Sequence, residues 1–248
     1  MYCLLNSDVE VTPHWLEAPM HIFAHEPQVS ILQPKIKSYK QKNYFEYAGA
    51  AGGYIDKYGF PYCRGRVFDT IEEDTGQYEE QMPIFWASGA CFFIRVSVFE
   101  HLGGFDEDFF AHQEEIDLCW RVQNEGYKVY YTPLSQIYHL GGATLEQGST
   151  QKVFLNFRNS LFMLLKNLPK GTWFSTIFLR MVLDGIAGIR FFFQGKLSHT
   201  WAILRAHFAF YKYFFHFYHK RKNPMLKQYY SVKSIAYSYF IKNKKVGY

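Results

Sequence analysis

The sequence predicts an α/β domain followed by an α-helical C-terminal region. Apolar residues make up 48% of the 248 residues, which is enough for a large core. Up to residue 148, short apolar runs alternate with helical patterns and glycine-rich loops, whereas long helical patterns fill the remainder. Residues 1–150 hold 10 Lys and Arg against 21 Asp and Glu, and residues 151–248 hold 17 against one. We therefore predict two regions, 1–148 and 149–248, that meet different partners.

The chain opens on an apolar run at residues 2–5, followed at once by the polar residues Asn6-Ser7-Asp8. This is the pattern of a buried strand that ends in a polar loop, and it differs from a secretory signal. Natural domains seldom begin inside a core strand. We therefore expect the first half of a larger domain to precede this chain.

Glycine and proline set the expected elements of the first region. Thr12-Pro13 predicts the start of a helix, and residues 30–33 predict a strand that ends before Pro34. Residues 35–82 predict a long loop region with short strands over a ligand cleft. Within it, residues 49–53 indicate a tight turn rather than a phosphate loop, because they do not match G-x-G-x-x-G.

The rest of the first region predicts two strands and two helices, and glycine or proline ends all of them except the first strand. They are a buried strand entered by a loop over residues 85–95, a short helix over 96–102, a helix over 114–124 and a strand over 127–131, ended by Pro133.

The basic C-terminal region predicts helices that lie in a membrane interface. Aromatic and cationic residues interleave on a helical period over residues 201–222, a composition that suits an anionic lipid surface. Segment 173–193 approaches membrane-spanning length, but Arg180, Asp184 and Arg190 argue against a span. Helices are expected over residues 152–167, 173–193, 200–219 and 230–242.

We therefore expect residues 173–222 to contact a membrane surface. A helical cap packed on the first region is the alternative. Nucleic acid is not an expected partner, because the cations accompany no readout motif. The four cysteines lie far apart without a C-x-x-C pair, so no zinc knuckle or disulfide framework is indicated and a reducing cytoplasm is the simplest compartment.

Six carboxylates fall between residues 106 and 117, most of them among large apolar side chains. Carboxylates are costly to bury unless a metal ion, a sugar hydroxyl or an arginine pairs with them. There is also an ordinary explanation: acids favour the first turn of a helix by about 0.3–1 kcal/mol each, and Asp117 and Arg121 have the i,i+4 spacing of a simple ion pair. The tight glycine turn before Glu114 and Glu115 favours a functional site.

Two further candidate residues follow predicted strands. Asp8 comes after the strand at residues 2–5, and ligands of open α/β sheets bind beyond the carboxyl ends of strands. Its carboxylate suits a divalent cation. His139 precedes two glycines in a polar loop, where a ligand role and a structural role are equally supported.

Five motifs follow one another along the first region. They are N-x-D at residues 6–8, W-x-S-G-A-C-x-x-I-R at 86–95, G-G-F-D-E-D-F-F at 103–110, E-E-x-D-L-C-W-R at 114–121 and H-L-G-G-A-T at 139–144. Together they resemble family-2 glycosyltransferases of the GT-A fold, closest to the bacterial rhamnosyltransferase-like branch that builds cell-surface polysaccharide. The resemblance implies a GT-A-like mixed sheet, of which this chain would lack the first nucleotide-binding strands.

The resemblance implies a role for each matching residue. Glu115 would be the general base, paired with Glu114. Asp8 would bind the metal and the diphosphate, and His139 would complete a site for Mg²⁺ or Mn²⁺. The implied substrate-binding residues are Trp86, Ser88, Gly89, Ala90 and Asp106.

The implied reaction transfers a sugar, with inversion, from a nucleotide-sugar donor to a saccharide or lipid-linked acceptor. Such an enzyme is expected to be cytoplasmic and peripheral, on the inner face of the cell membrane. A truncated, non-catalytic paralogue that binds a membrane or a partner is the first alternative. A metal-dependent hydrolase is the second.

Overall fold

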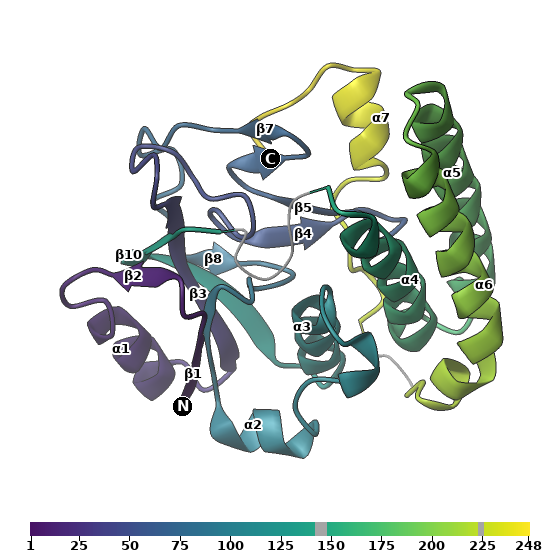
Figure 1. Cartoon of the computed structure of the whole chain (residues 1–248). Helices are drawn as coiled ribbons and strands as arrows, with labels where there is room; N and C mark the ends of the chain where they lie inside the picture. The colour runs from purple at the N-terminus through teal and green to yellow at the C-terminus, as the bar shows by residue number, and fades with distance from the viewer. Residues whose placement is uncertain (142–147, 223–225) are drawn as a thin grey trace.

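The computed structural model describes residues 1–141, 148–222 and 226–248. Its main sheet has six strands (Figure 1), which in sheet order are β1 (Tyr2–Leu5), β9 (Cys91–Ile94), β3 (Val29–Ser38), β10 (Lys128–His139) and β2 (Val9–Val11), with β8 (Met82–Pro83) beside β10. Strands β3 and β10 run parallel, and the other neighbours pair antiparallel. The predicted α/β class with a mixed sheet is confirmed.

The segment expected to be a loop region with short strands contains a second, four-stranded antiparallel sheet. Its strands are β4 (Gly53–Ile55), β5 (Pro61–Cys63), β6 (Arg66–Val67) and β7 (Thr70–Ile71). A bridge between Gly53 and Trp86 joins it to the segment that leads into β9. Glycine is required there, because an added Cβ would lie 2.1 Å from the Trp86 indole.

Strand β1 lies at the edge of the main sheet, so the expectation that it is buried is wrong. Among the described strands it pairs only with β9, and Tyr2 and Leu5 are 42% and 44% exposed. A short apolar run has the same composition at the edge of a sheet as in its middle. Burial depends on the number of pairing partners, which composition does not report.

The first helix, α1 (Glu17–His25), begins later than the Thr12-Pro13 signal predicts. The backbone at His14 has φ +61°, which a right-handed helix does not accommodate. The helix therefore starts only beyond this break. The next helix, α2 (Val96–His101), closely matches its prediction.

The two parallel strands continue through the prolines at which they were expected to end. β3 includes Pro34 and β10 includes Pro133, and their register shifts between Thr132 and Gln136. This bulge interrupts the hydrogen-bond ladder where the prolines lack a donor, so both are tolerated.

Helix α3 (Glu114–Asn124) has the predicted bounds and lies between the main sheet and the C-terminal helices (Figure 1). Its Asp117 is fully buried. The carboxylate accepts hydrogen bonds from Arg121 at 2.8 Å, as the spacing predicts, and from Lys166 and Asn167 at 2.9 and 2.8 Å. These partners offset the cost of burying the charge.

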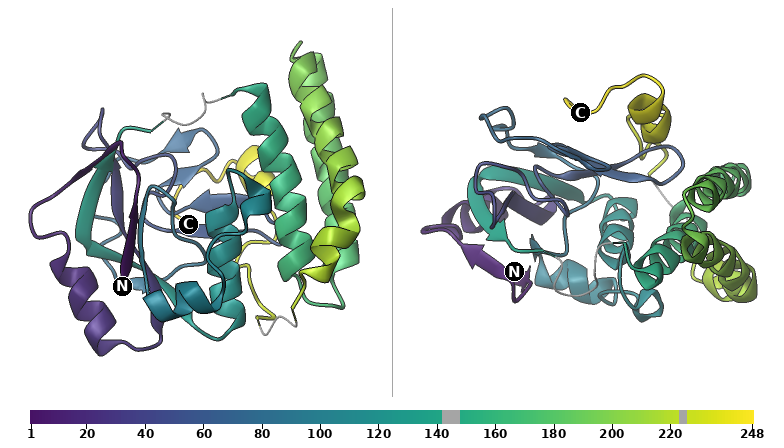
Figure 2. Two further views of the ribbon diagram at one scale, coloured as in Figure 1. Left: turned by 60° about the horizontal axis from the view of Figure 1, so that its bottom comes forward. Right: turned by 45° about the horizontal axis from the view of Figure 1, so that its top comes forward.

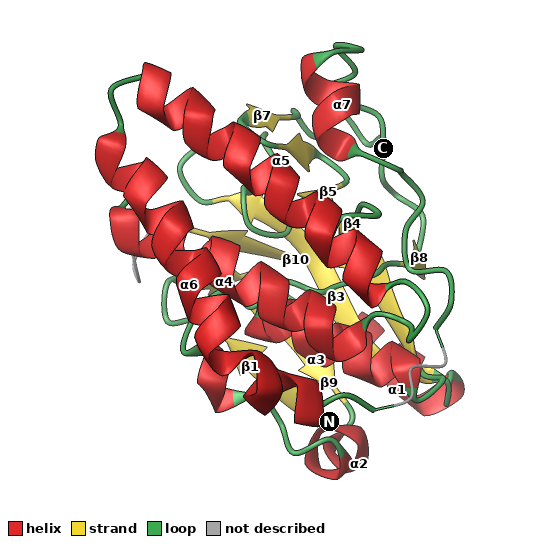
Figure 3. Ribbon diagram, turned by 90° about the vertical axis from the view of Figure 1, so that its right-hand side faces the viewer, coloured by secondary structure: helices red, strands yellow, loops and turns green. Residues whose placement is uncertain are grey.

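The C-terminal region adds an outer helical layer (Figures 2 and 3). Helix α4 (Thr150–Asn167) packs on α3, and α5 (Trp173–Phe193) and α6 (Leu197–His219) pack against α4 from outside. These three agree with the predicted helices, whereas the fourth is reduced to α7 (Ile235–Phe240). The division into two domains near residue 148 stays a prediction. None of the described helices is both long and apolar enough to cross a membrane.

Candidate active site

The antiparallel pairing of β10 and β2 brings Asp8 and His139 together. His139 ends β10 opposite Val9, and the Leu140 amide donates to the Asp8 carbonyl at 3.0 Å. The Asp8 Oδ1 atom then lies 3.3 Å from Nε2 of His139. The two predicted metal ligands are thus neighbours, although they come from opposite ends of the first region. Three residues of the last motif, Gly142, Ala143 and Thr144, lie outside the described residues.

A third residue, Glu46, joins this pair and was missed by the sequence analysis. Its Oε1 lies 3.4 Å from Nδ1 of His139, an ion-pair distance without hydrogen-bond geometry, and its Oε2 accepts from the Ala48 amide at 2.5 Å. Burial alone would lower the pKa of His139, but the Glu46 and Asp8 carboxylates outweigh it and raise the pKa. The sequence does contain a signal for Glu46, because this carboxylate lies between Phe45 and Tyr47. Residues 106–117 show the same pattern of acids among aromatic residues.

The Asp8 carboxylate is a ligand that Mg²⁺ and Mn²⁺ prefer, whereas the imidazole of His139 suits Mn²⁺ better than the oxygen-preferring Mg²⁺. Two adjacent ligands of an octahedral ion at 2.0–2.1 Å lie about 3 Å apart, close to the 3.3 Å observed. The second nitrogen of a ligating histidine usually faces a carboxylate, as Nδ1 faces Glu46. No group of three side chains with metal-binding geometry occurs among the residues described.

Glu114 and Glu115 occupy the first turn of α3, and each has a buried carboxylate oxygen without a hydrogen-bond partner in the described part of the chain. Burial, and then the neighbouring charge of Glu114, raise the pKa of Glu115 to about 8. Burial also raises the pKa of Glu114. A general base works best with a pKa near the operating pH, so Glu115 has the electrostatic setting that its predicted role needs.

The backbone that leads into α3 is strained. Phe110, His112 and Gln113 have φ values of +64°, +69° and +70°, and such conformations cost on the order of 1–3 kcal/mol each without glycine. Strain of this kind concentrates at functional sites. It sets the direction in which α3 presents its first two carboxylates.

Burial raises the pKa of the Cys63 thiol, and the charges of Glu46 and Glu115 raise it further. Over the described ranges, no hydrogen bond or ion pair connects Glu115 with Asp8 or His139. The contacts of the described residues therefore bring Asp8, His139 and Glu46 together and leave Glu115 outside that cluster.

Most of the predicted substrate-binding residues between Trp86 and Ala90 face inward. Trp86, Ser88 and Ala90 are 3%, 1% and 4% exposed, and Trp86 Nε1 donates to the Tyr54 carbonyl at 2.9 Å. Gly89 differs, because an added Cβ would meet no atom within 4 Å. In this conformation Gly89 is the part of the motif that a ligand can reach, and its neighbours shape the turn.

Asp106, predicted to bind substrate, already pairs with two lysines. It accepts from Lys166 at 2.6 Å and from Lys220 at 2.7 Å. Burial would raise its pKa, but the two ammonium groups outweigh burial and lower the pKa to about 2. These contacts connect the short 3₁₀ helix η1 (Glu107–Phe109), which Asp106 caps, to α4 and α6. The substrate-binding role of Asp106 stays a prediction.

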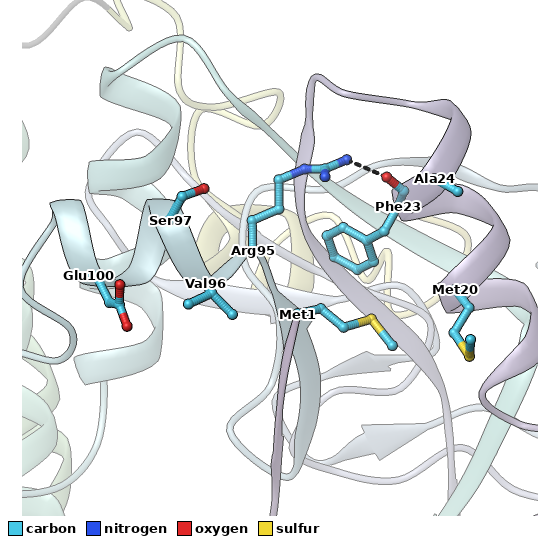
Figure 4. Close-up of a pocket in the computed structure, with 8 residues that line it drawn as sticks. All are labelled: Met1, Met20, Phe23, Ala24, Arg95, Val96, Ser97 and Glu100. Atoms are coloured by element: carbon cyan, nitrogen blue, oxygen red, sulfur yellow. Dashed lines mark hydrogen bonds between the residues drawn. The ribbon is translucent and has the colours of Figure 1, made fainter.

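A separate groove of about 710 Å³ lies beside α1 and α2 (Figure 4). Arg95 crosses it and donates to the Phe23 carbonyl at 2.9 Å. Met1, Met20 and Glu100 also line it. It contains none of the predicted site residues, and the bonds of Arg95 are structural.

A family model described as glycosyl transferase family group 2 matches residues 3–214. A Mycobacterium tuberculosis (strain CDC 1551) N-acetylglucosaminyl-diphospho-decaprenol L-rhamnosyltransferase is 23% identical over 188 residues, 75% of this chain and 60% of the relative. Rhamnosyltransferase WbbL of Escherichia coli K12 is 35% identical over 54 residues, 22% of this chain and 20% of the relative. A Haloferax volcanii low-salt glycan biosynthesis hexosyltransferase is 26% identical over 131 residues, 50% of this chain and 41% of the relative.

Among solved structures, GalNAc-T7 with UDP, GalNAc and Mn²⁺ aligns with a TM-score of 0.46 and 15% identity, over 65% of this chain and 30% of that one. The chain spans about 60% of the length of the mycobacterial relative. The family match covers both the main sheet and α4 to α6. This chain therefore belongs to glycosyl transferase family group 2.

Proposed function

We propose that the protein transfers a sugar from a nucleotide-sugar donor to a saccharide or lipid-linked acceptor in cell-surface polysaccharide synthesis. The observation that carries this proposal is the 3.3 Å approach of Asp8 to His139, together with α3, the base helix, whose first turn holds two buried carboxylate oxygens that have no partner among the described residues. Metal ligands and a raised-pKa carboxylate are the two chemical parts that such a transfer needs.

On the donor side, Asp8 and His139 would hold Mg²⁺ or Mn²⁺. The bound ion would neutralise the charge that develops on the diphosphate leaving group. Glu46 faces Nδ1 of His139 at 3.4 Å, and this favours the ring orientation in which Nε2 points to Asp8.

On the acceptor side, Glu115 would take the proton of the attacking hydroxyl. General-base catalysis of this kind is worth about 10²–10⁴ in rate. A single displacement by the acceptor oxygen inverts the anomeric carbon. The burial of Glu115, which raises its pKa, strengthens the carboxylate as a proton acceptor.

We further propose that the outer surface of α5 and α6 lies on the inner face of the cell membrane. Phe174, Phe193 and Phe215 are 70%, 81% and 72% exposed, and large exposed apolar surfaces usually meet a partner or a lipid. Basic residues attract anionic lipid. Exposed cations on these helices and their connection are Arg190, Lys196, Arg205 and Lys212. The alternative, that residues 173–222 form a cap on the first region, draws support from Arg180 of α5, which donates to the Tyr58 carbonyl at 3.1 Å.

The direct test incubates the protein with a panel of nucleotide sugars, Mn²⁺ and lipid-linked acceptors, and follows both transfer and donor consumption. Transfer that depends on acceptor supports the proposal. Donor consumption that is equal without acceptor would indicate a hydrolase instead. Membrane binding without consumption of any donor would favour the non-catalytic paralogue.

A further inference from the structure

The segment before the base helix has no glycine at its left-handed positions. Phe110, His112 and Gln113 all have positive φ, which costs conformational free energy in residues with a side chain. The Phe110 side chain is 81% exposed, so its own burial does not compensate. Contacts from elsewhere must hold this backbone in place.

Most of those contacts come from one buried amide on α4, and Nη2 of Arg158 adds a bond to the Phe109 carbonyl at 2.9 Å. Nδ2 of Asn159 donates to the carbonyls of Phe109, Ala111 and His112 at 3.0, 2.8 and 2.7 Å. Asn159 is 0% exposed, so water does not replace these bonds. Three carbonyls within four residues of the strained backbone thus share the two N–H groups of one amide.

Two neighbours complete this α4 clamp, which we define as Arg158, Asn159 and Ser160. Nε of Arg158 donates to Oδ1 of Asn159 at 2.8 Å, which fixes the amide so that its nitrogen faces the segment. Ser160 Oγ accepts from Nε2 of Gln113 at 2.7 Å. Gln113 immediately precedes Glu114, so the clamp ends at the first residue of the base helix.

We infer that Asn159 is a positioning residue that aims Glu115 by holding residues 109–113 in their strained conformation. The inference rests on the proposed function, because Glu115 matters only if it is the base. Without the three bonds, the strained residues can relax to right-handed or extended conformations. The first turn of α3 would then shift, and a shift of about 1 Å can cost 10² in rate.

The kinetic test uses Asn159→Asp, which keeps the size of the side chain but removes the donor. We expect kcat to fall about 100-fold with little change in the KM of the donor. A misplaced base weakens the stabilisation of the transition state and leaves donor binding unchanged. Asn159→Ala and Arg158→Ala give the same direction if Asn159→Asp does not fold. The matched control is Asn167→Ala, another buried α4 asparagine that pairs with Asp117 at 2.8 Å instead.

Thermal unfolding separates positioning from simple destabilisation. The control should lose as much stability as the Asn159 variants but keep its kcat when assayed well below its Tm. An equal loss of kcat in both, or unchanged kcat in the Asn159 variants, overturns the inference.

A substrate-free measurement keeps this inference distinct from the proposed function. Amide hydrogen exchange over residues 106–116 should speed up in Asn159→Asp and not in Asn167→Ala. Unchanged exchange overturns the clamp whatever the activity. A wild-type protein that transfers no sugar overturns the proposed function, and the role of the clamp in catalysis with it, even if exchange speeds up.

Discussion

The carboxylate of Glu46 lies 3.4 Å from Nδ1 of His139, whose Nε2 faces Asp8 at 3.3 Å. Glu46→Gln should weaken Mn²⁺ binding about 10–100-fold, because a partner that orients a ligating histidine contributes this much. Manganese titrations with nucleoside diphosphate, followed by electron paramagnetic resonance, measure the affinity. Glu10→Gln, on an exposed residue that pairs with Lys42, is the control. Equal affinities of both variants would argue against the orienting role.

The general base makes the largest kinetic prediction. Glu115→Gln should lower kcat about 10²–10⁴-fold, since the amide cannot accept the proton. Donor binding, measured by calorimetry, should change little. Glu125→Gln, at the exposed end of α3, should retain full activity. A Glu115→Gln variant with wild-type kcat would remove Glu115 from the mechanism.

The raised pKa of Glu115, about 8, fixes the sign of the pH dependence. The base acts as a carboxylate, so kcat should rise with pH through this value. The free energy of unfolding should change in the opposite direction. A carboxyl group whose pKa in the folded protein lies above its unfolded value of about 4.3 stabilises the fold at low pH. This stabilisation is lost as the pH rises through the folded pKa. Denaturant unfolding of the wild type between pH 5 and 9 checks this, with Glu115→Gln showing a flatter profile.

The ion pairs of Asp106 with two lysines should stabilise the fold at neutral pH and cease to do so in acid. Asp106→Asn should lower Tm by about 2–4 °C at neutral pH, the shift for ~1 kcal/mol in a chain of this size, because the bonds to Lys166 and Lys220 weaken. The lowered folded pKa, about 2, means that this contribution disappears as pH falls from about 4 to 2. Scanning calorimetry at several pH values tests it. Asp69→Asn, an exposed carboxylate, should leave Tm unchanged.

The membrane proposal is tested with vesicles that contain anionic phospholipid. Phe193→Ser and Phe215→Ser should each weaken sedimentation with vesicles by tenfold or more, because burying one such side chain contributes about 1.5–3 kcal/mol. Leu134→Ser is the matched control, since Leu134 is 75% exposed and lies in β10, outside the C-terminal helices. Unchanged binding of the phenylalanine variants would assign another role to this surface.

The sequence could predict those features that depend on local signals. The acidic first turn and Gly126 set the bounds of α3, and helical periodicity located α4 to α6. The ordered motifs also pointed to Asp8 and His139, which the fold brings into contact. Each of these features depends on residues that are close together in the sequence.

Features that depend on distant contacts could not be predicted in this way. Pro34 and Pro133 remain inside strands because a bulge in their mutual register removes the need for a donor. Glu46 reaches His139 only through the packing of a segment without a clear pattern of its own. The exposure of β1 likewise depends on which strands lie beside it.

Helix α4 has an architectural consequence, because its inner side bonds to the strained approach of the base helix and its outer side carries α5 and α6. Cutting the chain near residue 148 would therefore remove more than the proposed membrane surface. The remaining sheet would keep Asp8 and His139 but would lose the brace against which Glu115 is set. We therefore expect the acidic part of the sequence, expressed without the basic part, to lose the contacts that hold the start of α3.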